Sequence, residues 1–288
     1  MNRLIVLLTT LCISSAAVAA PPWEPLEARI AELEALLAGV TRGIDPGTGQ
    51  DTLQFSGMNV QIVNGAGTTD SINGTGNFIV GYNEIRDWEG GINYRTGSHM
   101  IVVGYQHNYN NAGGLLVGRH NDVTGPFASV SGGAGNLASG VSSSVSGGDF
   151  NVAQGENSSV SGGLSNFANA YGASISGGQG NEASADASSV SGGYVNLAFG
   201  RWTSIVGGGN NASSGEMSSV TGGQYNHAHS NWSSVTGGAA NQTFGDHSSI
   251  GGGNYNIANG QYSSVSGGDT RVADGQYDWR AGSLWEDN

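Results

Sequence analysis

A pattern of apolar and polar positions repeats every 15 residues over the second half of the chain. From about residue 117, a β-branched residue recurs at one position of the repeat, with no insertion between copies. These residues are Val130, Val145, Val160, Ile175, Val190, Ile205, Val220, Val235, Ile250 and Val265. The consensus is S-S-V-S-G-G-x-x-N-x-A-x-G-x-x. A fixed period of this length indicates a repeat architecture in which successive units stack on one another.

The chemistry of one repeat predicts its local structure. Ser144–Ser146 alternates polar and apolar with the period of a strand, so we expect the central Val to point inward and the serines outward. Gly147-Gly148 permits the positive φ of a tight turn. Asn151 and Ala153 are two residues apart and share one face of a second short strand, and Gly155 turns the chain back. Each repeat is therefore expected to form one coil of two strands and two turns.

An Asn recurs with the same 15-residue period, at another position of the repeat. Because coils stack at ~4.8 Å in a parallel arrangement, equivalent residues lie above one another. We therefore predict a ladder of side-chain amides that bond coil to coil, as in cross-β structures. Its members are Asn136, Asn151, Asn166, Asn181, Asn196, Asn211, Asn226, Asn241 and Asn256, and Asn121 shares their register.

The predicted fold class is all-β, a parallel β-solenoid of 15-residue coils preceded by a short helix. Its interior is thin, because each coil contributes one β-branched residue, one Ala and one Asn. Such a coil buries little apolar surface to offset ~1–2 kcal/mol of backbone entropy per residue. We therefore expect several chains to associate side by side.

Residues 1–20 resemble a secretory signal peptide. Arg3 supplies the positive charge, Leu4–Ile13 the apolar core, and Ala17-Val18-Ala19 the small-residue cleavage signal. Cleavage after Ala19 or Ala20 would remove Cys12, the only cysteine of the chain. The mature protein is then expected to be secreted, extracellular or at the cell surface, and free of thiols.

Residues 21–42 are predicted to form a short helix with a heptad seam. Trp23, Ile30 and Leu37 occupy position a, and Leu26, Leu33 and Val40 occupy position d. A helix of this length is marginal on its own in water. It either packs on its own domain as an amphipathic helix or forms an oligomerising coiled coil.

The remaining segments flank the repeats. Residues 43–116 are expected to form irregular β-structure or an N-terminal cap, with degenerate coils at 77–81 and 100–104. Residues 117–275 form the regular solenoid. Residues 276–288, with Trp279 and Trp285, are expected to cap its C-terminal end, where unpaired strand edges would otherwise be exposed.

The S-V-S-G-G-x-x-N-x-A-x-G unit resembles the head repeats of trimeric autotransporter adhesins. The shared features are the central Val or Ile, the Gly after it, the later Ala and the closing Gly, over about residues 100–275. The resemblance implies a left-handed β-roll, a homotrimer with coiled coils, and an adhesive or surface-structural role. We expect this chain to lack the membrane-anchor barrel of that family.

Composition narrows the classes of function. The formal net charge is −13, and all nine basic residues are Arg. Nucleic acids and anionic membranes attract Lys and Arg, so we expect neither as a partner and no membrane insertion. No nucleophile elbow, P-loop, zinc-protease or calcium-repeat motif is present. His227 and His229 share a strand face but lack a third ligand in register. We therefore expect a protein without catalysis, cofactor or metal.

One column of the repeat is rich in aromatic residues. We select Trp202, Trp232, Tyr262 and Tyr277 as candidate ligand-binding residues, with Met217 and His247 between them. Rows of exposed aromatics mark binding sites. The column serves either as corner or inter-subunit packing or as a stacking platform for sugars.

A second column carries carboxylates. Glu156 and Asp186 lie two coils apart, and the strand spacing puts them about 9.6 Å from each other. This separation is near that of the two carboxyl groups of inverting glycosidases. An alternative hypothesis is therefore a polysaccharide-binding or polysaccharide-cleaving trimer that resembles a tail fibre. Asp186, Arg201 and Glu216 are also in register for an ion-pair ladder.

A third hypothesis rests on hydroxyl groups. Ser occupies the position before each β-branched residue in every coil from Ser129 to Ser264, and Ser or Thr follows in most coils. A flat hydroxyl array could order water, as in an ice-binding solenoid. The preferred expectation remains a secreted or cell-surface, structural or adhesin-like repeat protein that presents a long regular surface to a glycan or a host or matrix surface.

Overall fold

The computed structural model describes residues 24–87 and 91–282, and the chain divides into two units, Met1–Gln61 and Ile62–Asn288. The expected signal peptide, Trp23 and Trp285 lie outside the described residues. In the first unit, helix α1 (Glu24–Leu36) is followed by a hairpin of β1 (Val40–Ile44) and β2 (Asp51–Phe55). The described seam positions of α1 are exposed, with Leu26 at 62%, Ile30 at 47% and Leu33 at 45%.

Helix α1 ends earlier than the heptad pattern predicts. Leu37 lies in the turn after the helix, and Val40, expected at a d position, begins β1. Gly39 has a φ of +89°, and a Cβ there would come within 2.6 Å of the Ser56 carbonyl oxygen. The positive φ of this glycine ends the helix and turns the chain into the hairpin.

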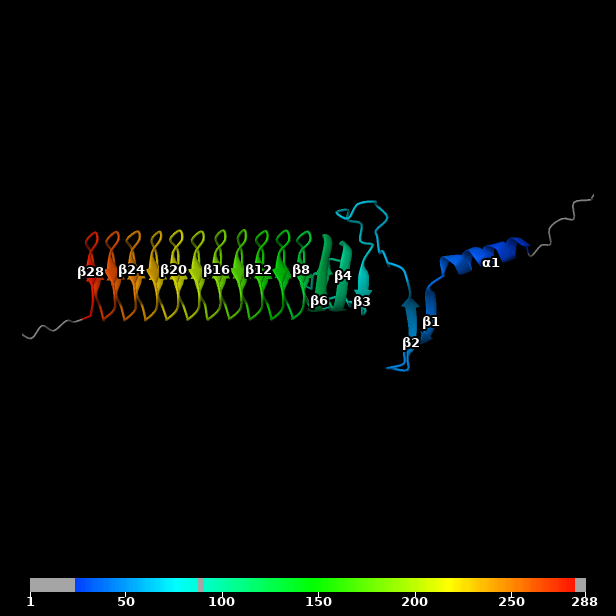
Figure 1. The fold of residues 1–288 in the computed structure, drawn as a ribbon, viewed down its shortest axis with the longest axis horizontal. Coiled ribbons are helices and arrows are strands. Elements are labelled where there is room, and N and C mark those ends of the chain that lie inside the picture. Colours follow the sequence, from blue (N-terminus) through cyan, green and yellow to red (C-terminus); the bar gives the residue numbers. More distant parts are fainter. Residues whose placement is uncertain (1–23, 88–90, 283–288) are drawn as a thin grey trace, which may run out of the picture. The chain divides into compact units, whose positions relative to one another are not determined.

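The second unit is a parallel β-solenoid of 15-residue coils, as the repeat predicts (Figure 1). From β4 on, successive strands alternate between a 14-stranded sheet, here the serine sheet, and a 12-stranded sheet, here the alanine sheet, so each coil adds one strand to each sheet. The serine sheet contains β3 (Phe78–Val80), β4 (Ser98–Tyr105), β6 (Ala112–Arg119), β8 (Ser129–Val130), β10 (Ser144–Val145), β12 (Ser159–Val160), β14 (Ser174–Ile175), β16 (Ser189–Val190), β18 (Ser204–Ile205), β20 (Ser219–Val220), β22 (Ser234–Val235), β24 (Ser249–Ile250), β26 (Ser264–Val265) and β28 (Trp279–Arg280). The alanine sheet contains β5 (Asn108–Tyr109), β7 (Asp122–Val123), β9 (Leu137–Ala138), β11 (Val152–Ala153), β13 (Phe167–Ala168), β15 (Glu182–Ala183), β17 (Leu197–Ala198), β19 (Ala212–Ser213), β21 (His227–Ala228), β23 (Gln242–Thr243), β25 (Ile257–Ala258) and β27 (Val272–Ala273).

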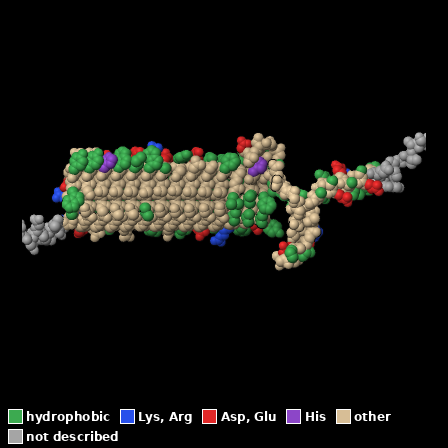
Figure 2. All heavy atoms as spheres, in the orientation of Figure 1, with side chains coloured by type: hydrophobic (Ala, Val, Ile, Leu, Met, Phe, Trp, Pro, Cys, Tyr) green, Lys and Arg blue, Asp and Glu red, His purple; other side chains and the backbone are tan. Residues whose placement is uncertain are grey.

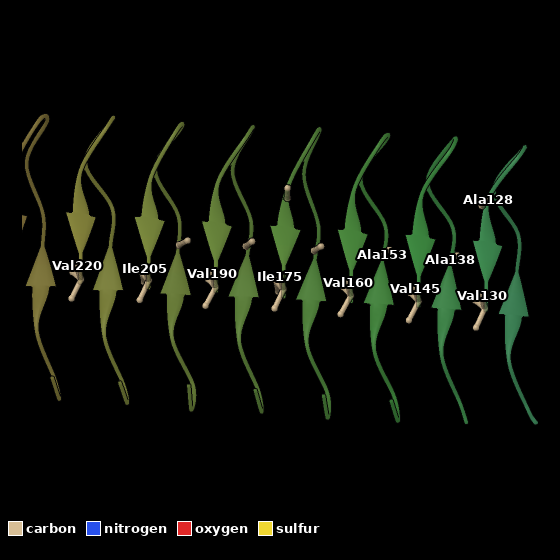
Figure 3. Close-up of a cluster of buried hydrophobic side chains, with 14 of the residues drawn as sticks. Ala128, Val130, Ala138, Val145, Ala153, Val160, Ile175, Val190, Ile205 and Val220 are labelled. Atoms are coloured by element: carbon tan, nitrogen blue, oxygen red, sulfur yellow. The ribbon is translucent and has the colours of Figure 1, made fainter. Parts of the chain in front are cut away.

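The core lies between the two sheets. The β-branched residues of the serine sheet and the Ala residues of the alanine sheet are almost completely buried and face one another (Figure 3). Besides the β-branched, Ala and Asn columns, a fourth inward column was not expected: Ser143 and its equivalents, two residues before each β-branched residue, are also buried. The interior of each coil is therefore small-residue and partly polar throughout.

Glycines at two corners of the coil lie close to the backbone of the next coil. Gly155 does not adopt a positive φ, but a Cβ there would lie 1.9 Å from the Ala170 carbonyl oxygen. Gly148 combines a φ of +78° with a Cβ position 2.2 Å from the Gly163 carbonyl oxygen. Both glycines thus allow the close stacking of coils, and the second glycine of each pair also allows the turn.

The first coils differ from the regular repeat. In β4 and β6 the register is 14 residues, with Ser98 opposite Ala112. A longer segment separates β3 from β4, and Arg86 fastens it to the solenoid through Asp122 and the carbonyl oxygen of Gln106. This ion pair is largely buried on the Arg side, so it holds the irregular segment against the first regular coils.

Candidate functional site

Three of the four selected aromatic residues, Trp232, Tyr262 and Tyr277, form a continuous stack with His247 along one corner of the solenoid. Figure 2 shows a row of hydrophobic side chains, with a histidine in it, along one edge of the repeat. The ring centroids are 4.9 Å apart for Trp232 and His247, 4.8 Å for His247 and Tyr262, and 5.1 Å for Tyr262 and Tyr277. The planes of these pairs lie within 12° of parallel. We call this column of the repeat the aromatic ladder. Its members are Trp202, Met217, Trp232, His247, Tyr262 and Tyr277.

The other members of the aromatic ladder, Trp202 and Met217, make contacts of a different kind. The indole Nε1–H of Trp232 donates to the Met217 sulfur at 3.1 Å. The Arg201 guanidinium lies 4.3 Å from the centre of the Trp202 ring, a cation–π contact. The four residues selected from sequence thus belong to one surface, and Met217 and His247 fill the places between them.

Every member of the aromatic ladder has a left-handed backbone. Their φ values lie between 53° and 61°. Bulky residues rarely adopt this conformation, and strained backbone costs on the order of 1–3 kcal/mol per residue. Earlier coils place Ser142, Asn157 and Gly172 at the same position. The aromatic side chains are therefore not there because of the turn, and a role for the side chains themselves is indicated.

The stack decides which part of each ring a partner can meet. Because adjacent rings lie parallel at about the coil spacing, their faces turn toward one another along the solenoid axis. Trp202, Met217, Trp232, Tyr262 and Tyr277 remain 42–69% exposed, with Tyr277 the most exposed, and His247 is exposed as well. A partner therefore meets mainly ring edges and Tyr hydroxyls, and an open ring face occurs only where the stack ends.

The carboxylate column lies beside the aromatic ladder. Glu156 and Asp186 are both exposed. Asp186 pairs with Arg201 at 3.8 Å between Oδ2 and Nε. Among the ion pairs of the described residues, none joins Arg201 to Glu216, so the expected three-member ladder is reduced to one pair. Neither carboxyl has the apolar surroundings that a general acid of a glycosidase requires.

The two neighbouring histidines form a ring cluster on the outer side of the alanine sheet. His227 and His229 meet edge to face at 5.1 Å, and His229 stacks on Phe244 at 4.7 Å. Burial lowers the pKa of both histidines. Within the described residues, no three His, Cys, Asp or Glu side chains come together to hold a metal ion.

The asparagine column is buried, and its hydrogen bonds differ from the expected amide ladder. The Asn151 side-chain amide donates to the carbonyl oxygens of Gly147 and Gly163, both at 3.0 Å. Its Oδ1 accepts the backbone N–H of Asn166 at 3.0 Å. The same bonds recur from Asn136 to Asn256. Each Asn thus satisfies backbone groups of its own and the next coil. Direct amide–amide bonds occur at Asn166–Asn151 and Asn241–Asn226.

No protein-family model and no curated protein matches this chain. In the part of the chain that the structure describes, no helix is long and apolar enough to cross a membrane.

Proposed function

We propose that this chain is the repeat body of a secreted or cell-surface protein, structural and adhesin-like, that binds an extracellular partner without catalysis. The aromatic ladder is the observation that carries this proposal. A glycan or a host or matrix protein is the proposed class of partner. Tyr and Trp supply large contact area with a polar edge and are enriched in binding interfaces.

The rigidity of the solenoid supports a binding role. Each coil is held by backbone ladders in both sheets and by the buried asparagine column. A surface held in this way loses little conformational freedom on binding, which favours affinity. The members of the aromatic ladder also lie one coil apart, so a long partner can engage several of them at once.

We further propose that the protein assembles as a homotrimer with the short helix as one contact. The seam of α1 is exposed, and 13 residues are too few for an independently stable helix. Association with the same helix of other copies would cover Leu26, Ile30 and Leu33. The likeness of the repeat to trimeric adhesin heads favours three copies.

The binding role is tested with paired variants at two corners. Trp232→Asn and Tyr262→Asn remove two members of the aromatic ladder, whereas Tyr225→Asn and Tyr255→Asn remove exposed tyrosines from the other left-handed column. Asn accepts this backbone in the native Asn157, so both pairs keep the turn. Mature protein is applied to immobilised polysaccharides and matrix proteins. Loss of binding only in the first pair supports the proposal, and equal binding by all variants refutes it.

The enzymatic alternative is separable from binding. Glu156→Gln and Asp186→Asn remove the carboxylates and leave the aromatic ladder intact. Polysaccharide that gains new reducing ends with the native protein but not with these variants would favour cleavage. Binding without such ends supports the proposed role.

A further inference from the structure

The outer side of the serine sheet changes character along the solenoid. In its first coils, alternate residues of β4 point inward and are buried, as Met100 and Val102 are. The residues between them point outward, and they align with outward residues of β3 and β6. These six side chains are Phe78, Val80, Ile101, Val103, Leu115 and Val117, here the apolar patch. Figure 2 shows hydrophobic side chains gathered over β3, β4 and β6.

The apolar patch is open in the single chain. Phe78 is 51% exposed, Val80 46% and Ile101 48%, and the other three members are partly exposed. Contiguous apolar groups of this kind on a soluble protein mark an interaction surface.

Beyond the apolar patch, the same side carries only small uncharged residues from Ser129 to Ser266. Ser129 and its equivalents form one outward column, and the next column is Ser or Thr except at Val206 and Gly251. We call this surface the serine strip. It ends at Trp279, which is 61% exposed and whose indole N–H donates to Ser266 Oγ at 2.9 Å. Exposed apolar groups therefore bound the serine strip at both ends.

Charge is excluded from the serine strip. Between residues 129 and 266, the Asp, Glu and Arg residues are Asp149, Glu156, Glu182, Asp186, Arg201, Glu216 and Asp246. All of them lie at the corners or on the alanine sheet. A sheet face that meets water ordinarily carries polar and charged side chains. An acidic protein that keeps one broad face uncharged can bring that face against another negatively charged copy without repulsion at the contact.

We propose that the outer side of the serine sheet is the surface by which copies of this chain pack against one another. A parallel copy in register would place apolar patch against apolar patch and serine strip against serine strip. Small side chains let two backbones approach closely, and the common coil spacing matches along the whole contact. This inference rests on the homotrimer of the proposed function and adds the face on which it forms.

Single cysteines locate the contact, because Cys12 is the only native cysteine and lies in the expected signal peptide. Ser191→Cys lies on the serine strip, and Ser214→Cys lies on the outer side of the alanine sheet; both native serines are exposed. Packed sheets lie about 10 Å apart, so a bis-maleimide of that length joins facing copies. We expect covalent dimers from Ser191→Cys and almost none from Ser214→Cys.

Charge insertion provides a second readout. Ile101→Asp and Val103→Asp place carboxylates in the apolar patch, and Phe167→Asp is the control on the alanine sheet. All three positions face outward, so each variant should keep its circular dichroism spectrum. The patch variants should lose most of the assembled species by light scattering, whereas the control should retain it.

The outcomes separate the inference from the proposed function. Cross-linking through Ser214→Cys alone, or assembly that survives both patch variants, overturns the proposed face and leaves the homotrimer standing. A monomeric native protein overturns both. A monomeric protein in whose dilute solution ice crystals grow with facets would instead indicate that the serine strip binds ice.

Discussion

The Nδ1 atom of His107 accepts the backbone N–H of Asn121 at 3.3 Å. In the regular coils this place is taken by the Oδ1 atom of an Asn, as where Asn121 accepts the N–H of Asn136 at 2.8 Å. His107 Nε2 lies 3.1 Å from the Val103 carbonyl oxygen and therefore carries the proton. The backbone N–H of His107 in turn donates to Asn83 Oδ1 at 2.6 Å. The histidine thus continues the asparagine column into the first coils, but only in its neutral form.

This arrangement predicts an acid-sensitive rung. Burial lowers the pKa of His107 below its usual 6.5, and the Arg86 charge acts in the same direction. The unfolded chain then binds a proton more readily than the folded one. The stability contribution of neutral His107 is therefore present above about pH 6.5 and is lost as pH falls below it. The hydrogen-exchange protection of the Asn121 amide should therefore fall on acidification from pH 7 to pH 5, relative to the protection of the Asn181 amide.

His107→Asn is the matched variant for this prediction, because it installs the ladder's own residue. Its Asn121 amide should show much less pH dependence than the native one. An equal loss of Asn121 protection in both proteins would mean that another group causes the acid sensitivity.

A single rung of the asparagine column should be costly to remove. Asn181 donates to the carbonyl oxygens of Gly177 and Gly193 and accepts the Asn196 N–H. Asn181→Ala removes the partner of the Gly177 carbonyl oxygen and of the Asn196 N–H, at about 1–3 kcal/mol for each unsatisfied group, whereas the Gly193 oxygen keeps its bond from the Gln179 N–H. We expect a loss of at least about 2 kcal/mol in chemical denaturation. Asn259→Ala, at an exposed position, should cost less than about 1 kcal/mol; similar losses for both would contradict the ladder's role.

Breaking the aromatic ladder should affect binding more than stability. His247→Asn removes two stacked contacts, each worth about 0.5–1.5 kcal/mol, but relieves left-handed strain at a bulky residue. The two effects oppose one another, so the thermal midpoint should change by only a few degrees. A large fall in the midpoint would show that the ladder is chiefly a structural brace.

The last coil that the structure describes, which contains β28, is predicted to prevent end-to-end growth of the solenoid. Arg280 stands opposite Val265, where the repeat otherwise has an inward β-branched residue, and Arg271 stands in the asparagine column. Inward-pointing charge is a recognised way to protect a sheet edge. The double variant Arg271→Asn, Arg280→Val should therefore form elongated particles visible by electron microscopy. Arg201→Val, at an exposed corner, should not; particles of one length in all proteins would contradict this role.

Much of the solenoid could be predicted because period and residue type agree at every coil. Val145, Ala153 and Gly148 each have the environment that their spacing indicates. Ser143 was missed although it lies two residues before Val145 and so shares its inward face. The alternation of the strand carries that signal, but a hydroxyl side chain does not by itself indicate burial.

Other features depend on geometry that spacing does not carry. The left-handed backbone at Trp232 follows from the corner path and contradicts the preference of its residue type. The partners of Asn151 are backbone carbonyls because the glycine corner brings them within reach. The edge-outward rings of the aromatic ladder arise from stacking at the coil distance. A repeat pattern indicates which residues align, but not how their side chains turn.

The mass of the mature protein in solution tests the central claim most directly. Light scattering would be performed on the mature chain and on a form that lacks residues 21–42. We predict three times the mass of one chain for both forms, because the repeat body has its own contact surface on the serine sheet. A monomer in both forms would contradict the assembly and the face assigned to it.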